Sequence, residues 1–141
     1  MGEGELRDVA TRLHAASIRL LRTLRREDDG VGLSAPRLSA LSVIAFGGPL
    51  SLAELAAAEQ VRPPTMSRIV DHLVEDGLVT REPAPGDRRS VRISATEEGR
   101  RLMEAGRERR VRALVRRLVA LAASERRGLA RGVGVLGRAE R

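Results

Sequence analysis

The sequence contains no cysteine, lysine, tryptophan or tyrosine, and Phe46 is its only aromatic residue. Without cysteine, disulfides, thiolate metal sites and redox sensing by thiols are impossible. Without aromatic side chains for bases to stack on, the usual way of binding single-stranded nucleic acid is disfavoured. The sequence also shows no signal peptide and no apolar run of about 18 residues or more, so we expect a cytoplasmic protein with no membrane partner.

Arginine is the residue type that the sequence has in excess. The 141 residues carry a net charge of +7, and all 26 basic residues are arginine. A guanidinium group binds two phosphate oxygens at once, so this composition is typical of a protein that contacts nucleic acid. An apolar content of 42% is enough for the core of one domain of ordinary size.

Groups of residues that carry catalysis are missing from the sequence. We find no Ser/His/Asp grouping, no glycine-rich phosphate loop and no paired carboxylates in an apolar setting, so an enzyme is disfavoured. His14 invites interpretation as a metal ligand, but His72 is the only other histidine and no carboxylate lies at a suggestive spacing from His14. We therefore expect no metal and no cofactor, and we interpret His14 as a partly buried neutral histidine.

Residues 51–80 have the pattern of two short helices joined by a turn and followed by a strand. Ser51 and Glu54 are spaced as in a capping box, in which each side chain accepts a free N–H at the start of a helix. Pro63 and Pro64 fit the first turn of a second helix, where a missing N–H costs nothing, and Gly77 ends that helix. The second helix carries an apolar stripe at helical spacing, formed by Met66, Ile69, Val70, Leu73 and Val74.

Another face of this second helix is too polar to belong to a core. It contains Thr65, Arg68 and His72, flanked by Pro64, Ser67 and Asp71. In a helix-turn-helix, such a face enters the major groove of DNA. The helix pair alone is weak evidence, because many helical hairpins bind nothing.

A predicted β-hairpin follows and makes the evidence more specific. Residues 78–82 and 90–93 have the pattern of short strands, and the loop 83–89 between them ends in Asp87, Arg88 and Arg89. A guanidinium on a protruding loop can enter the narrow minor groove, where the negative potential is enhanced. An isolated Asp-Arg-Arg triplet is usually a solvated turn, but beside this helix pair it favours a DNA-binding wing whose tip is held by Asp87.

The region from the second helix onward closely resembles the winged helix-turn-helix of the MarR family of bacterial transcription regulators. Three motifs match that family in order and spacing: Gly77-Leu78-Val79, Asp87-Arg88-Arg89 and Thr96-Glu97-Glu98-Gly99. The resemblance covers roughly residues 5 to 138, and its specific motifs lie in residues 51–99. It implies that Arg89 is the minor-groove arginine and that Asp87 orients it.

The same resemblance implies a mainly α fold with a small β wing (α+β). The whole chain, 1–141, would form a single MarR-like domain. A winged helix-turn-helix part would occupy residues 34–96. A helical dimerisation part would be built from residues 5–29 and 97–139, because in this family the first helix and the last two helices of each subunit interlock with those of a partner.

The remaining elements are predicted from the residues themselves. Residues 5–26 have a helical pattern with a narrow apolar seam that packs on another helix. Residues 34–46 form a helix capped by Ser34. The resemblance to winged helices implies that Leu50 supplies the short strand that pairs with the wing there. Thr96 caps a helix that reaches residue 122 or 123. The last helix begins at Ser124 and Glu125 and contains four glycines, so it needs a packing partner.

We therefore expect a sequence-specific regulator that binds double-stranded DNA as a homodimer, reads a palindrome and represses by occupying promoters. Recognition-helix residues that meet base edges or nearby phosphates would be Pro64, Thr65, Ser67, Arg68 and His72. Arg62 would contact phosphate. Arg37, near the start of its helix, is equally well explained as a phosphate contact or as an ordinary exposed arginine.

Two questions stay open at the level of sequence. A winged helix used as a protein-interaction module is the alternative function, although Arg68 and the arginines of the wing argue against it. MarR-like proteins often bind a small effector between the dimerisation and winged parts, and His14, Ser17 and Phe46 are candidates to line such a cleft. Nothing identifies an effector, and a regulator without one fits equally well.

Overall fold

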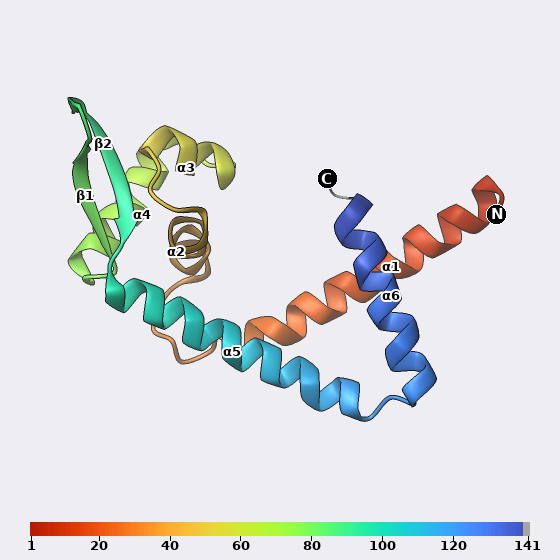
Figure 1. The fold of residues 1–141 in the computed structure, drawn as a ribbon. Helices are drawn as coiled ribbons and strands as arrows, with labels where there is room; N and C mark the ends of the chain where they lie inside the picture. The colour runs from red at the N-terminus through yellow and green to blue at the C-terminus, as the bar shows by residue number, and fades with distance from the viewer. Residues whose placement is uncertain (140–141) are drawn as a thin grey trace. The chain divides into compact units, whose positions relative to one another are not determined.

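The computed structural model describes residues 1–139, which form six helices and one antiparallel β-hairpin (Figure 1). This confirms the mainly α fold with a small β wing. In chain order the elements are α1 (Glu3–Arg26), α2 (Ala35–Gly47), α3 (Leu52–Ala58), α4 (Pro63–Glu75), β1 (Val79–Ala84), β2 (Asp87–Ala95), α5 (Glu97–Val119) and α6 (Ala123–Ala139).

The chain divides into two compact units. Asp28–Arg107 form the first, which contains α2, α3, α4, the hairpin and the first half of α5, and which we call the winged unit. Met1–Glu27 and the described residues from Glu108 onward form the second, which we call the helical unit. None of the described helices is both long and apolar enough to cross a membrane.

The winged unit has a continuous apolar core. Helix α4 contributes Met66, Val70 and Leu73, each fully buried, as its apolar stripe predicts. Val74, the last residue of the stripe, is 37% exposed, because on a helix it lies farthest from the centre of the stripe. Ile69, on the other edge, is partly buried. The other buried core residues are Ala40, Leu41, Ile44, Leu55, Ala56, Leu78, Val79, Ile93, Ala95 and Met103.

Local capping sets the limits of the two helices that form the helix-turn-helix. Ser51 Oγ accepts the N–H of Glu54 at 3.1 Å, and Glu54 Oε2 accepts the N–H of Ser51 at 2.8 Å, which confirms the capping box. Helix α4 begins at Pro63, as predicted. Ser34 stands at the N-cap of α2 but makes no side-chain cap hydrogen bond, so only its position was correct.

Gly77 lies just beyond the C-cap of α4 and forms a left-handed turn. Its φ is +72°, a conformation that glycine adopts without the steric cost of a Cβ. The N–H of Gly77 donates to the carbonyl of Val74 at 3.0 Å, and the N–H of Leu78 donates to that of Leu73 at 2.9 Å. This is the Schellman arrangement, which directs the chain straight from α4 into β1.

The wing is longer and its turn tighter than the sequence pattern indicated. The strands pair from Val79 with Ala95 to Ala84 with Asp87, so only Pro85 and Gly86 lie in the turn. The expected loop 83–89 was therefore wrong, and Arg88 and Arg89 lie in β2 near the turn. Proline followed by a glycine with a φ of +79° satisfies a two-residue turn, and the strand register is irregular next to it, between Pro83 and Ala84.

Leu50 pairs with the wing as predicted. Its N–H donates to the carbonyl of Ile93 at 3.2 Å, and the N–H of Ile93 donates back to Leu50 at 2.8 Å. These two bonds anchor the C-terminal part of β2 to the segment between α2 and α3.

The start of α5 is joined tightly to the chain that leaves the end of α4. Thr96 Oγ accepts the N–H of Gly99 at 3.1 Å, which confirms Thr96 as the cap, and donates to the carbonyl of Gly77 at 2.7 Å. The N–H of Thr96 donates to the carbonyl of Leu78 at 2.9 Å. A Cβ added at Gly99 would collide with that same carbonyl oxygen, so only glycine allows this approach.

The helical unit contains little buried apolar surface. Helices α1 and α6 have no buried residues. His14 is exposed, so its interpretation as a partly buried histidine was wrong: no neighbouring side chain covers this part of α1 within the described chain. The C-terminal end of α1 is held by Glu27, whose carbonyl accepts Arg109 Nε at 3.3 Å and whose carboxylate lies 3.9 Å from Arg116 Nη2.

The boundary between α5 and α6 differs by a few residues from the prediction. Helix α5 ends at Val119 rather than at residue 122 or 123. Helix α6 begins at Ala123, and the carboxylate of Glu125 accepts the N–H of Ala122 at 2.7 Å. Ser124 therefore lies inside the first turn, one residue after the start of the helix, and not at the cap position.

Candidate nucleic-acid interface

The polar face of α4 is exposed to solvent. Pro64, Thr65, Arg68 and His72 are all exposed, and Ser67 is half-buried beside them. Arg62 is exposed at the N-cap of the helix and makes no side-chain cap bond. This face therefore presents cationic and hydrogen-bonding groups along the helix, while the opposite face is fixed in the core.

Recognition-helix residues have few competing contacts. Within the described residues, the guanidinium groups of Arg62 and Arg68 make no ion pair or hydrogen bond in the chain. His72 Nδ1 lies 3.4 Å from Glu75 Oε2, one turn along α4. Arginines that are not already paired are available to bind phosphate or base acceptors without breaking an internal contact.

The arginines of the wing are exposed, and Asp87 organises the backbone around them. Asp87 Oδ1 accepts the N–H of Arg89 at 2.9 Å. The contact is with the backbone of Arg89 and not with its guanidinium, so Asp87 fixes the direction of the chain at the start of β2. In the part of the chain that the structure describes, the guanidinium groups of Arg88 and Arg89 have no ion-pair partner.

Two ion pairs tie the wing to the helix-turn-helix, one from each strand. Arg81 of β1 lies 2.6 Å from Asp71 of α4, measured from Nη2 to Oδ1. Arg92 of β2 lies 3.3 Å from Glu54 of α3, measured from Nη1 to Oε2. Sequence analysis missed both pairs. An outward-facing arginine in a strand next to an acidic helix face is the signal, but it does not say which carboxylate the arginine meets.

Arg37 lies in the first turn of α2, partly exposed. It belongs to the winged unit, as do the recognition helix and the wing. Its role as a phosphate contact stays a prediction.

The three candidate effector residues do not belong to one unit. His14 and Ser17 are exposed residues of α1, where Ser17 Oγ donates to the carbonyl of His14 at 2.8 Å. Phe46 is 54% exposed at the end of α2, in the winged unit. Their joint role in an effector cleft therefore stays a prediction.

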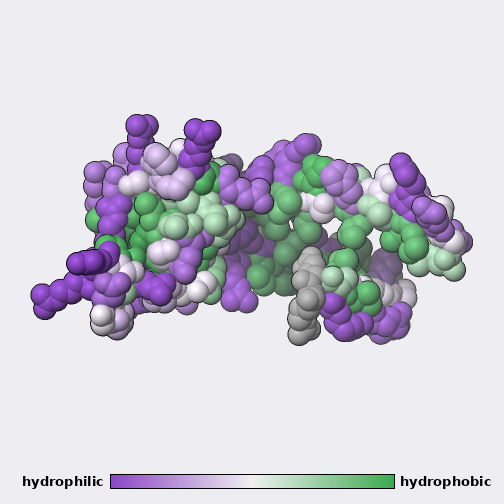
Figure 2. Space-filling view, turned by 90° about the horizontal axis from the view of Figure 1, so that it is seen from above, coloured by the Kyte–Doolittle hydropathy of each residue, from purple (hydrophilic) through white to green (hydrophobic). Residues whose placement is uncertain are grey.

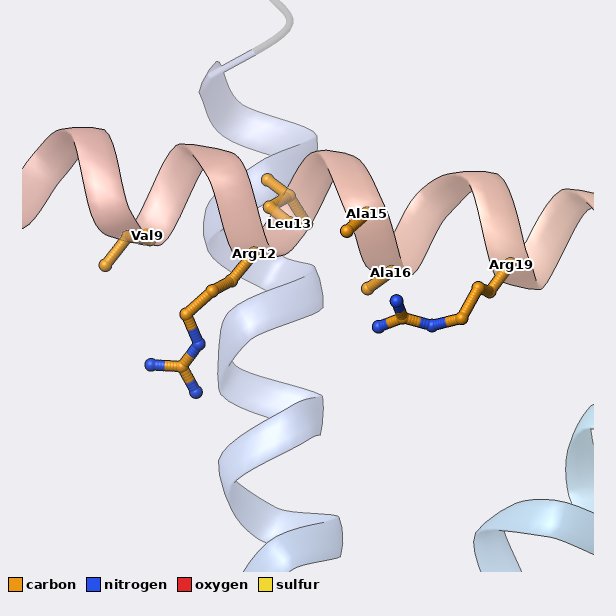
Figure 3. Close-up of a pocket in the computed structure, with 6 residues that line it drawn as sticks. All are labelled: Val9, Arg12, Leu13, Ala15, Ala16 and Arg19. Atoms are coloured by element: carbon orange, nitrogen blue, oxygen red, sulfur yellow. The ribbon is translucent and has the colours of Figure 1, made fainter.

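A groove along α1 does not include these residues. All of its lining side chains come from α1, namely Val9, Arg12, Leu13, Ala15, Ala16 and Arg19 (Figure 3). A surface contributed by one helix is open on its other sides, so it does not form an enclosed ligand site. Among the described residues, no three His, Asp or Glu side chains are arranged to hold a metal ion.

Comparison with known proteins gives consistent matches over most of the chain. The model of the MarR family matches residues 33–91. An uncharacterised HTH-type transcriptional regulator of Mycobacterium leprae, ML2140, is 39% identical over 118 residues, which are 84% of this chain and 82% of that protein.

Solved structures match the fold over almost the full length. RV1404 of Mycobacterium tuberculosis is 28% identical with a TM-score of 0.84, covering 99% of this chain and 97% of that chain. A MarR family protein of Bacillus stearothermophilus is 25% identical with a TM-score of 0.83, covering 99% and 98%. A mutant of Staphylococcus aureus MepR, solved bound to an oligodeoxyribonucleotide, is only 16% identical, with a TM-score of 0.71 over 94% and 98%, and shows likeness of fold alone.

Proposed function

The chain belongs to the MarR family of transcription regulators, and from this premise we propose that it is a homodimeric repressor of a palindromic operator in double-stranded DNA. It is a DNA-binding regulator and not an enzyme. The proposed DNA recognition rests on one observation: a single unit combines an exposed polar face on α4 with exposed arginines on the adjoining wing. Such a protein acts in the cytoplasm, where the bacterial chromosome lies.

Each part of this surface has a different task in the proposal. Thr65, Ser67, Arg68 and His72, with Pro64 beside them, lie at base edges or nearby phosphates in the major groove. Arg62 and Arg37 bind phosphates, which adds affinity without sequence preference. Arg88 and Arg89 enter the adjacent minor groove. The oligonucleotide-bound MepR mutant, which shares the fold, supports DNA as the partner of this architecture.

Association of two copies is supported by the helical unit. Large apolar side chains of α1, α5 and α6 are exposed, including Leu6, Val9, Leu13, Leu21, Val115, Val119, Leu129, Val133 and Leu136, and Figure 2 shows apolar residues at the surface of these helices. Large exposed apolar patches often mark the places where proteins associate, so these side chains are candidates for a subunit interface. A two-fold pair would present two recognition helices to half-sites about 10 bp apart, centre to centre, and would repress by occupying the promoter.

The proposal includes release from DNA by a small effector whose identity is open. His14, Ser17 and Phe46 are the candidate contacts. A screen for compounds that release the protein from its best DNA sequence tests for an effector, and substitution of these residues then tests the contacts.

The proposal is tested by selecting bound sequences from random duplex DNA and measuring affinity for the best sequence and for mutated half-sites. We expect a palindrome and an affinity that falls steeply with salt, because phosphate contacts release counterions. Arg89→Ala should weaken binding to all sequences. Arg68→Ala should also relax specificity at one position, by about 1–3 kcal/mol if Arg68 reads guanine.

Two results would contradict the proposal. Equal specificity of wild type and Arg68→Ala would remove the base-reading role of Arg68. Weak binding to duplex DNA that hardly changes with salt would instead favour the protein-interaction module.

A further inference from the structure

Arg81 reaches from the wing to the recognition helix. Its Nη2 donates to Asp71 Oδ1 at 2.6 Å and lies 3.5 Å from the carbonyl oxygen of Ser67. Ser67 and Asp71 are four residues apart and therefore share one face of α4. A single nitrogen of the guanidinium thus connects β1 to two residues of α4.

This face overlaps the proposed base-reading face, because Ser67 belongs to both. Arg68 and His72 each follow one of the two residues that Arg81 contacts, so they lie one position further around the same turns of α4. Arg81 is 36% exposed and Asp71 51% exposed, so the pair is at the surface and not in the core. A change in the pair therefore alters the position of the wing more than the stability of the fold.

The negative charge of Asp71 allows two possible roles of this residue in DNA binding to be distinguished. A carboxylate on a helix that approaches DNA repels the phosphates, so its removal by itself should strengthen DNA binding. A carboxylate that holds a wing in place has the opposite effect, because its removal frees the wing. The direction in which affinity changes therefore separates the two roles.

We propose that Arg81 and Asp71 are positioning residues, whose ion pair fixes the wing against the recognition helix so that Arg88 and Arg89 meet the minor groove while α4 occupies the major groove. This inference rests on the proposed function. Neither residue needs to contact DNA itself. The second pair, Arg92 with Glu54, ties β2 to α3, but Glu54 Oε2 also accepts the N–H of Ser51, so substitution of Glu54 would disturb a helix cap as well.

The first test compares the DNA affinity of Asp71→Ala with that of the wild type, using the full chain and its selected duplex. We expect Asp71→Ala to bind about 3- to 30-fold more weakly, which lies within the range of coupling between residues in contact. Asp76→Ala is the matched control, because it also removes a carboxylate from the end of α4 but does not touch Arg81. The control should bind as tightly as the wild type or more tightly.

The second test uses double-mutant cycles with Arg81→Ala. If Arg81 acts through Asp71, the double variant Arg81→Ala/Asp71→Ala should bind no more weakly than Arg81→Ala alone. If Arg81 positions the wing, adding Arg89→Ala to Arg81→Ala should cost less affinity than Arg89→Ala costs in the wild type. Arg101→Ala, which removes a surface arginine paired with Glu97 in α5 at 2.8 Å, controls for the loss of one positive charge.

The outcomes are decisive in either direction. Asp71→Ala binding as tightly as or more tightly than the wild type, or cycles in which the losses multiply independently, overturns the inference and makes Arg81 an ordinary phosphate contact. Thermal melting of each variant by circular dichroism shows that the fold is retained. Failure of the wild type to bind any duplex sequence overturns the proposed function instead, so the two failures are distinguishable.

Discussion

The winged and helical units differ in where their apolar side chains lie. In the winged unit these side chains are buried in one core that includes Leu41, Leu55, Leu73 and Ile93. In the helical unit, Ala113 is the only buried apolar residue among the described residues, and large apolar side chains such as Leu6 and Val133 are 52% and 59% exposed. The winged unit therefore has the means to fold by itself, whereas the helical unit needs a second surface to cover it.

This difference assigns the two units separate sources of stability. Apolar burial contributes roughly 25 cal/mol for each Å² removed from water, and the winged unit obtains this within one chain. In our proposal, the helical unit obtains it only when two chains meet, so its stability depends on protein concentration. Substitutions in the two units should consequently be distinguishable by whether their effect changes with concentration.

The largest effect is expected from a charge placed in the exposed apolar face of α6. Val133 is 59% exposed and shares one side of the helix with Leu129 and Leu136. Val133→Asp should raise the dissociation constant of the dimer by at least about 100-fold, because a two-fold axis buries the unpaired carboxylate twice. Sedimentation equilibrium measures the constant, and operator affinity should fall with it.

The matched control is Arg131→Ala, which changes an exposed residue on the other side of α6. It should leave the association unchanged. A wild-type chain that remains monomeric at all concentrations would break the comparison, because the exposed apolar face would then have no partner.

A pair of glycines sharpens the comparison at the level of packing. A Cβ at Gly99 would meet the carbonyl of Leu78, so Gly99→Ala should lower the free energy of unfolding by about 1–3 kcal/mol. A Cβ at Gly134 of α6 would meet only the guanidinium of Arg138, at 3.8 Å. Gly134→Ala should therefore raise stability by about 0.5–1 kcal/mol through helix propensity. Chemical denaturation checks both signs, and equal signs would contradict the packing described for Gly99.

The smallest effect is expected at two serine caps within the winged unit. Ser51→Ala should cost about 1 kcal/mol of stability, because Ser51 Oγ accepts the N–H of Glu54. Ser34→Ala should be nearly neutral, since Ser34 makes no cap bond. Denaturation midpoints of the two variants at equal protein concentration provide the measurement. A loss at Ser34 as large as that at Ser51 would show that cap geometry does not control these helices.

Features set by neighbouring residues could be predicted from the sequence. The capping box at Ser51, the start of α4 at Pro63 and the left-handed turn at Gly77 depend on residues within one turn of helix. The bridge at Leu50 and the cap at Thr96 were predictable because both are next to β2 of the wing, whose position the wing motif determines. The fold class followed from the order of these local signals.

Features set by tertiary contacts could not be predicted in the same way. The turn of the wing consists of Pro85 and Gly86 and not of the expected loop 83–89, because strand pairing extends to Ala84 and Asp87. The sequence pattern of each strand alone does not specify how far the two strands pair. The pairing of Arg81 with Asp71 depends on how β1 crosses α4. The exposure of His14 depends on what covers α1, and sequence periodicity gives the face of a helix but not its neighbour.

The joint at Leu78 has a mechanical consequence. The carbonyl of Leu78 accepts the N–H of Thr96 and lies against Gly99. The N–H of Leu78 donates to the carbonyl of Leu73 in the last turn of α4. Leu78 thus links the end of α4 to the first turn of α5 through direct contacts, without a flexible segment between them. In our proposed function, a tilt of the first turn of α5 would therefore tilt the end of α4 as well and change the angle at which α4 meets DNA.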